Sequence, residues 1–135
     1  MRTIAIDYGD ARTGVALSDP SGLIAGEAFV LQKLGDRKLI EELCRLAAEK
    51  QGQCFILGLP KNMNGTEGPR AEKTRAFGTR LAEASGLSVL YRDERLTTVD
   101  AHRILHDGGK HGAKNRARVD AVAAVLILEG YLRES

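Results

Sequence analysis

The sequence predicts an α/β protein with a five-stranded mixed sheet, in which three antiparallel strands are followed by two parallel ones and helices flank the sheet. The first observation is a run of three short β-rich segments joined by tight turns near the N-terminus. The second is that apolar residues at helical spacing then alternate with short continuous apolar runs. The third is the length of 135 residues, which suits one domain over residues 1–135.

Three strands are expected before the first helix, over residues 3–6, 13–18 and 27–31. Asp7 follows the first of them, and the turn-forming residues Asp19–Gly22 close the second. Because the links between these segments are short, the strands should pair as an antiparallel meander.

Four helices and two further strands are expected in the rest of the chain. Strands that alternate with helices are normally parallel, so the later strands should extend the meander into a mixed sheet. In chain order the elements are a helix over 36–51, capped by Asp36 and ended by Gly52; a strand over 54–59, buried on both faces; a helix over 66–85, capped by Thr66; a strand over 87–91; a helix from Thr97 or Thr98 to 107; and a helix over 116–132.

The composition indicates a globular protein with an uneven distribution of charge. Apolar residues make up 43% and charged residues 28% of the chain, and the formal net charge is +2. Bases and acids balance up to Asp107, whereas five bases and three acids follow it, so the whole excess lies in the last part of the chain. This asymmetry indicates an anionic partner for that part.

Neither a membrane segment nor a disulfide is expected. The longest apolar run, residues 121–128, is far shorter than the roughly 20 residues that a membrane span needs. The N-terminal residues leave no room for the apolar stretch of a signal peptide. Cys44 and Cys54 are too few to staple a domain of this size, so we expect reduced thiols in a cytoplasmic protein.

Four carboxylates stand where catalytic acids are expected. Asp7 follows the first strand, Asp93 and Glu94 follow the fifth, and Asp120 begins the most apolar stretch of the chain. Strand ends in α/β folds open onto one edge of the sheet, and acids gathered there would repel one another without cations between them. Oxygen ligands suit Mg²⁺ or Mn²⁺, so the pattern favours metal-dependent phosphodiester hydrolysis. Each acid taken alone also fits a turn former or a helix-dipole partner.

Four segments of the chain resemble, in the same order, the motifs of one family. They are residues 7–16 (DYGDARTGVA), 58–68 (GLPKNMNGTEG), 93–98 (DERLTT) and 114–124 (KNRARVDAVAA). Together they extend over nearly the whole chain, and they are similar to the four blocks of the YqgF (RuvX) family.

The resemblance implies an RNase H-like fold related to the Holliday-junction resolvase RuvC. It also implies a nuclease that matures the 5′ end of pre-16S ribosomal RNA or resolves branched DNA. By this resemblance Asp7 and Asp120 are metal ligands, Glu94 is the middle acid, and Asp93 is the alternative to it.

The chain departs from the RuvC pattern at two places. RuvC-type enzymes carry an acid after the fourth strand, where Gly58–Pro60 has none. They also carry a second acid near the aspartate of the last helix, where this chain has Ala117 and Ala123. These departures leave the number of metal ions and the strength of catalysis open.

Polar residues near the motifs are candidates for contacts with nucleic acid. Arg12 can form a bidentate pair with a phosphate, and the loop that begins at Asn62 can present amide groups to a backbone. The basic stretch from Lys110 to Arg118 can bind phosphates. Turn, cap and solvated-surface roles are the alternatives. The candidate set is Arg12, Asn62, Asn64, Arg95, Thr97, Lys110, Lys114, Arg116 and Arg118.

The sequence therefore favours a nuclease with catalytic residues Asp7, Glu94 and Asp120, Mg²⁺ or Mn²⁺ as cofactor, and precursor rRNA or branched DNA as partner. RNA or DNA as the substrate, and a monomer or a homodimer, stay open. A protein that binds nucleic acid without cutting it is a second hypothesis, because of the missing acids. An actin-like ATPase is a third, since Asp-x-Gly opens that fold too, but that class needs two such domains around ATP.

Overall fold

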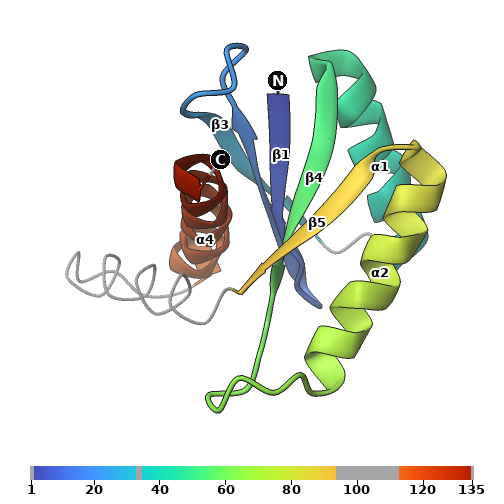
Figure 1. The fold of residues 1–135 in the computed structure, drawn as a ribbon, viewed down its shortest axis with the longest axis vertical. Coiled ribbons are helices and arrows are strands. Elements are labelled where there is room, and N and C mark those ends of the chain that lie inside the picture. Colours follow the sequence, from blue (N-terminus) through green and yellow to red (C-terminus); the bar gives the residue numbers. More distant parts are fainter. Residues whose placement is uncertain (1, 33–34, 94–112, 135) are drawn as a thin grey trace.

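The computed structural model describes residues 2–32, 35–93 and 113–134, with side chains from Ala121 onward in the last segment (Figure 1). The expected helix from Thr97 or Thr98 lies outside the described residues. In chain order the elements are β1 (Arg2–Asp7), β2 (Arg12–Ser18), β3 (Ala25–Gln32), α1 (Gly35–Lys50), β4 (Gly52–Leu59), α2 (Pro69–Ser85), β5 (Ser88–Asp93) and α4 (Ala113–Glu134).

The five strands form one mixed sheet in the order β3-β2-β1-β4-β5. β2 pairs antiparallel with β1 and with β3, whereas β4 lies parallel to β1 and to β5. The predicted meander followed by parallel strands is confirmed. Residues 3–6 of β1 and 54–59 of β4 are buried, as expected for strands that are covered on both faces.

The helices cover both faces of the sheet. α1 and α2 lie on one face and α4 lies on the other (Figure 1). Because strand residues alternate between faces, Ile4 and Ile6 of β1 belong to the core beneath α1 and α2. Ala5, between them, belongs to a second core with Ala124 and Ile127 of α4. The central strand therefore contributes to both cores.

The ends of α1 differ from the expected ones. α1 begins at Gly35, so Asp36 lies within its first turn instead of capping it. The helix ends at Lys50, and Gln51 takes the left-handed conformation (φ 57°) that we expected of Gly52. Gly52 instead opens β4, where a Cβ atom would lie 2.7 Å from Ile4 Cδ1, so close packing favours glycine there.

α2 begins later than expected, and Thr66 is not its cap. The N-cap is Gly68, which makes no side-chain hydrogen bond, and Pro69 follows in the first turn, where its missing N–H costs nothing. The Thr66 hydroxyl instead donates a 2.6 Å hydrogen bond to Asn64 Oδ1 within the preceding loop. At the other end, Gly86 is the left-handed cap (φ 73°), as expected.

α4 begins at Ala113 and not at residue 116, so Lys114 belongs to its first turn, whereas Arg116 and Arg118 lie within the helix as expected. Its first turns lie toward the edge of the sheet at which β1, β4 and β5 end (Figure 1). Of the helices in the described part of the chain, none has both the length and the apolarity that a membrane crossing requires.

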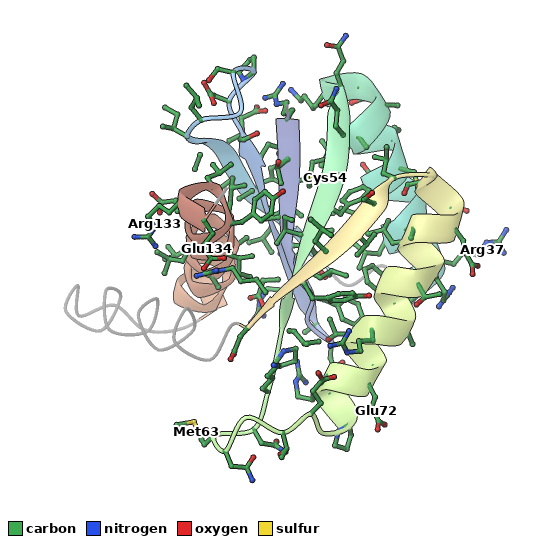
Figure 2. All side chains as sticks on the ribbon, viewed as in Figure 1. Arg37, Cys54, Met63, Glu72, Arg133 and Glu134 are labelled. Atoms are coloured by element: carbon green, nitrogen blue, oxygen red, sulfur yellow. The ribbon has the colours of Figure 1, made fainter. Side chains whose placement is uncertain are left out.

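Both cysteines are free thiols, as predicted. Cys44 packs against the core beneath α1 and α2, whereas Cys54 of β4 belongs to the core beneath α4 (Figure 2). The sheet lies between the two sulfur atoms, so they cannot form a disulfide with each other.

Candidate functional site

Asp7 closes the central strand β1 and is partly buried. Strand alternation places it with Ala5 on the face of the sheet that α4 covers. Its partner in β2 is Gly14, and on the other side β1 pairs with β4 as far as Ile6 with Leu57, the residue before Gly58. Gly14 places no side chain beside the Asp7 carboxylate.

Asp93 is the last residue of β5, whereas the expected strand ended at Tyr91, and it lies on the opposite face of the sheet from Asp7. Arg92 lies on the α4 side, where its guanidinium forms an ion pair with Glu134. Because neighbouring residues of a strand alternate, Asp93 is directed toward the side of α1 and α2. Glu94 lies outside the described residues.

Asp120 lies in the second turn of α4, four residues before Ala124, which shares a core with Ala5 of β1. Asp7 lies two residues beyond Ala5, or about 7 Å along the strand. Asp120 precedes Ala124 by about 6 Å along the helix axis. Because α4 starts toward the edge at which β1 ends, both displacements run to that edge of the sheet (Figure 1).

No three histidines, cysteines or carboxylates gather into a metal-binding group among the described side chains, which do not include those of Glu94 and Asp120. Asp7 supplies the carboxylate oxygens that hard divalent cations prefer. The donor therefore fits a divalent cation.

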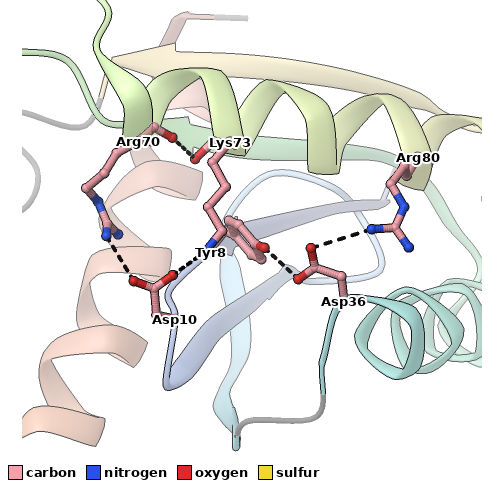
Figure 3. Close-up of polar contacts among 7 residues, drawn as sticks. Tyr8, Asp10, Asp36, Arg70, Lys73 and Arg80 are labelled. Carbon is pink, nitrogen blue, oxygen red and sulfur yellow. Dashed lines mark hydrogen bonds and ion pairs between the residues drawn. The ribbon is translucent and has the colours of Figure 1, made fainter.

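A polar network on the opposite face holds the end of β1 (Figure 3). Tyr8 stacks on Phe77 of α2, with ring centroids 4.2 Å apart, and its hydroxyl donates a 2.5 Å hydrogen bond to Asp36 Oδ1 in α1. The other oxygen of Asp36 lies 3.5 Å from Arg80 of α2. Burial, followed by the hydrogen bond to Asp36 and the charge of that residue, raises the pKa of Tyr8 well above its ordinary value of 10.0. The phenol therefore stays protonated.

A second carboxylate ties the turn between β1 and β2 to α2. Lys73 Nζ donates a 2.6 Å hydrogen bond to Asp10 Oδ1, and an Arg70 nitrogen lies 3.4 Å from Asp10 Oδ2 (Figure 3). The hydrogen bond from Lys73, with the charges of both bases, lowers the pKa of Asp10. An open cavity of about 280 Å³ lies beside these groups, and its lining includes Asp10, Arg12 and Lys73.

Three predicted nucleic-acid contacts are described, and they differ in their surroundings. Arg12 opens β2 and lines the cavity. Asn62 and Asn64 instead hold the shape of their own exposed loop: Asn62 Nδ2 donates to Thr66 Oγ1 at 3.0 Å, and Asn64 Oδ1 accepts from the Thr66 N–H at 3.1 Å. Met63 is 87% exposed at the tip of this loop (Figure 2). These bonds fit the turn role considered for the two asparagines, and their contact with nucleic acid stays a prediction.

The other candidates are only partly described. Arg95, Thr97 and Lys110 lie outside the described residues, and the backbone positions of Lys114, Arg116 and Arg118 lie at the start of α4. Conversely, the sequence did not predict the Tyr8 and Asp10 networks. Helical spacing could have indicated their partners, because one stripe of α2 carries Arg70, Lys73, Phe77 and Arg80.

The strand order, with Asp7 ending the central strand on the face under a C-terminal helix, defines an RNase H-like protein. The structure of Thermus thermophilus RuvC is similar with a TM-score of 0.61 at 12% identity, over 99% of this chain and 96% of that one. The fowlpox virus Holliday junction resolvase is similar with a TM-score of 0.57 at 13% identity, over 100% of both chains. The expected RNase H-like fold is confirmed.

The chain belongs to the RuvX family, whose sequence model, described as "Holliday junction resolvase", matches residues 1–134. A relative from Ruminiclostridium cellulolyticum, named "Putative pre-16S rRNA nuclease", is 42% identical over 133 residues, or 98% of this chain and 94% of the relative. A relative of the same name from Streptococcus gordonii is 44% identical over 135 residues, or 98% and 97%. The family predicted from the four motifs is confirmed, and it is a family of nucleic-acid hydrolases.

Proposed function

We propose that this protein is a divalent-metal-dependent nuclease that processes the 5′ end of precursor 16S ribosomal RNA. The observation that carries the proposal is Asp7, a carboxylate at the end of the central strand with Gly14 beside it in β2. Relatives named for this substrate, 42% and 44% identical over nearly the full length, support rRNA as the target. Action on precursor rRNA implies a cytoplasmic protein, with residues 1–135 as one catalytic domain.

In this proposal Asp7, Glu94 and Asp120 hold Mg²⁺ or Mn²⁺ through their carboxylate oxygens. Glu94 is preferred to Asp93 because strand alternation directs Asp93 to the opposite face from Asp7. A bound cation supplies an activated water and stabilises the charge that develops on the phosphate. The matching positions of Asp7 and Asp120 along strand and helix support this ligand set.

The hydrolysis cleaves one phosphodiester bond of the substrate. The water oxygen bonds to phosphorus and the P–O3′ bond breaks, so the products end in a 5′-phosphate and a 3′-hydroxyl. The rigid strand end keeps the Asp7 carboxylate in place against the reacting phosphate. Arg12 and the bases at the start of α4 are proposed to bind flanking phosphates, together with Arg95, Thr97 and Lys110.

Cleavage of a precursor 16S rRNA transcript in Mg²⁺ or Mn²⁺ tests the proposal. Asp7→Asn should lower the rate at least about 100-fold, because even groups that only orient metal ligands contribute 10–100-fold. Glu94→Gln should do the same, whereas Asp93→Asn and Glu72→Gln, an exposed acid of α2, should keep most of the activity. Cleavage that survives Asp7→Asn would exclude this site.

Branched DNA is the second candidate substrate. The family model is described as a Holliday junction resolvase, and T. thermophilus RuvC in complex with a Holliday junction substrate shares the fold with a TM-score of 0.59. A four-way junction therefore belongs in the same assay. Light scattering on the purified protein adds a second readout, since a symmetric junction suits a homodimer with two sites and a monomer suits RNA processing.

The second hypothesis, a protein that binds nucleic acid without cutting it, is motivated by the glycine at position 58. RuvC-type enzymes carry an acid at this strand end, and Gly58 places no carboxylate beside Asp7. Salt-dependent binding of RNA with no cleavage in any divalent metal would favour the binding role over the nuclease.

A further inference from the structure

Two bases of α2 converge on a single exposed acid. Arg70, Lys73 and Asp10 have side chains that are 63%, 55% and 63% exposed, yet both bases contact the same carboxylate. Ion pairs this exposed contribute little to stability, because water screens them and the long side chains lose freedom. The stability of the fold therefore does not account for the arrangement.

The location of this group connects it to the proposed catalytic edge. Asp10 lies three residues after Asp7, and three residues extend over at most about 11 Å. The neighbouring cavity of about 280 Å³ is lined by Asp10, Lys73 and Arg12. Asp36 lines it as well, but its two oxygens are taken by Tyr8 and Arg80. Two bases, Lys73 and Arg12, thus line the open cavity with the Asp10 carboxylate, and Arg70 contacts that carboxylate as well.

We propose that Arg70 and Lys73 form a phosphate-binding pair for the nucleic-acid backbone, which Asp10 occupies until the substrate displaces it. The inference rests on the proposed function in one respect, that the substrate is a nucleic acid. A carboxylate and a phosphate offer charged oxygens to the same donors, so one can replace the other. When phosphate oxygens take the two bases, the Asp10 carboxylate returns to water, where it is already largely exposed.

The pair would extend the substrate contact across the turn between β1 and β2. Asp7 faces α4, whereas Lys73 lies over Tyr8 on the other face, with its Nζ 6.0 Å from the ring centroid. A strand that passes Asp7 and continues over the turn would meet Arg12 and then Arg70 and Lys73. The surface that contacts the nucleic acid would then extend beyond the edge of the sheet at which the acids lie.

α2 also carries a matched control for the charge of the pair. Arg75 donates hydrogen bonds of 2.6 and 2.8 Å to the two oxygens of Glu67, and both side chains are partly exposed. Arg75 lies over Tyr91 of the edge strand β5, 4.9 Å from the ring centroid, and β4 separates this strand from β1. Neutralising Arg75 therefore changes the net charge as much as neutralising Lys73 alone, and neutralising Glu67 as much as neutralising Asp10, but at another place.

Binding of fluorescein-labelled probes, measured by anisotropy in EDTA so that no cleavage occurs, tests the proposal. A short single-stranded RNA and a four-way DNA junction serve as probes. Arg70→Gln/Lys73→Gln should weaken binding at least about 10-fold at ~50 mM salt and lower the salt slope for the single strand by about 1.4. Arg75→Gln should change the dissociation constant less than about 2-fold.

A second set of variants tests the role of Asp10. Asp10→Asn should tighten binding several-fold, and the gain should vanish in the Arg70→Gln/Lys73→Gln background, whereas Glu67→Gln should have little effect. The inference is overturned if the double variant binds like wild type, or if Asp10→Asn tightens binding equally in that background. It is also overturned if Arg75→Gln is as harmful as Lys73→Gln. If the wild-type protein binds neither probe, the proposed function falls with it.

Discussion

The Tyr8 hydroxyl lies 2.5 Å from Asp36 Oδ1 and so joins the end of the central strand to the first turn of α1. The Tyr8 ring is 8% exposed and is stacked on Phe77 of α2. Because adjacent strand residues face opposite sides, fixing Tyr8 on one face directs Asp7 to the other. Two helices therefore hold the strand end from behind the proposed site.

Tyr8→Phe keeps the stacked ring and removes the hydrogen bond. We expect the free energy of unfolding to fall by about 1 kcal/mol, the usual net contribution of such a bond, as measured by urea denaturation. Tyr91→Phe is the control, because the Tyr91 hydroxyl donates only a long 3.4 Å bond to the Arg75 carbonyl and should matter less. A Tyr8→Phe protein as stable as wild type would show that the hydrogen bond from Tyr8 to Asp36 does not contribute to the free energy of unfolding.

The raised pKa of Tyr8 also makes stability depend on pH in the alkaline range. The unfolded phenol loses its proton near pH 10, whereas the folded one keeps it to higher pH, so the unfolded state binds fewer protons there. The contribution of Tyr8 is therefore complete below pH 10 and is lost as the pH rises above it. Between pH 9 and 11, the free energy of unfolding should fall more steeply for wild type than for Tyr8→Phe. Parallel curves would contradict this.

Gly78 is buried within α2 where the helix meets β4 and β5. An added Cβ atom would lie 2.2 Å from the Tyr91 hydroxyl oxygen and 2.9 Å from Leu57 Cδ1. Helix propensity favours alanine by about 1 kcal/mol, but overpacking costs about 1–3 kcal/mol. We expect Gly78→Ala to lower the free energy of unfolding by about 1 kcal/mol, measured in urea.

A double variant separates crowding from other causes of that loss. Tyr91→Phe removes the oxygen nearest to the new methyl group, so Gly78→Ala/Tyr91→Phe should recover part of the stability relative to the sum of the single changes. A Gly78→Ala protein that melts above wild type would mean that Tyr91 and Leu57 move aside without cost.

Ser18 is fully buried, and its hydroxyl oxygen accepts a 2.8 Å hydrogen bond from the Thr3 N–H. The pairing of β1 with β4 shifts register between Arg2 and Thr3, so a side chain supplements the backbone hydrogen bonds near this point. Ser18→Ala leaves the Thr3 N–H without this acceptor, and we expect a loss of about 1–3 kcal/mol in thermal unfolding. The exposed Ser88→Ala is the control and should be neutral.

Metal binding at the proposed acids should couple to stability. Without metal, Asp7→Asn should raise the melting temperature by a few degrees, because it removes repulsion between gathered carboxylates. Mg²⁺ at about 100 times its dissociation constant should stabilise wild type by ~2.7 kcal/mol and the variant much less. Differential scanning fluorimetry with EDTA or Mg²⁺ measures both effects, and equal shifts in the two proteins would argue against Asp7 as a ligand.

The order of the elements was predictable because the burial of each element requires a recognisable apolar pattern in its own sequence. The run Cys54–Leu59 is apolar throughout, and β4 has neighbours on both sides and helices on both faces. Helix ends were less predictable, because their signals compete. Thr66 and Gly68 are both acceptable caps, and Pro69 decides between them. The left-handed residue is Gln51, and Gly52 instead packs against Ile4, a contact between segments distant in the chain.

Only the residues of the candidate site that stand at the end of a single strand could be predicted from the sequence. Asp7 stands at the end of β1, as the sequence indicated. The face that Asp93 takes depends on β5 continuing to that residue instead of ending at Tyr91, so the choice between Asp93 and Glu94 required the register. The hydrogen-bond partners of Tyr8 and Asp10 lie 28 to 63 residues away in the chain, so helical spacing can indicate a stripe of α2 but not which residues that stripe contacts.

The separation of Asp7 from its supports by the thickness of the sheet has a genetic consequence. Changes at Asp36, Phe77 or Arg80 act on the strand end from a surface opposite to the proposed site. Activity can thus change during evolution, or be restored after a harmful mutation, through substitutions that do not contact the substrate. Second-site suppressors of a weakened Asp7 neighbourhood should therefore map to α1 and to the C-terminal half of α2.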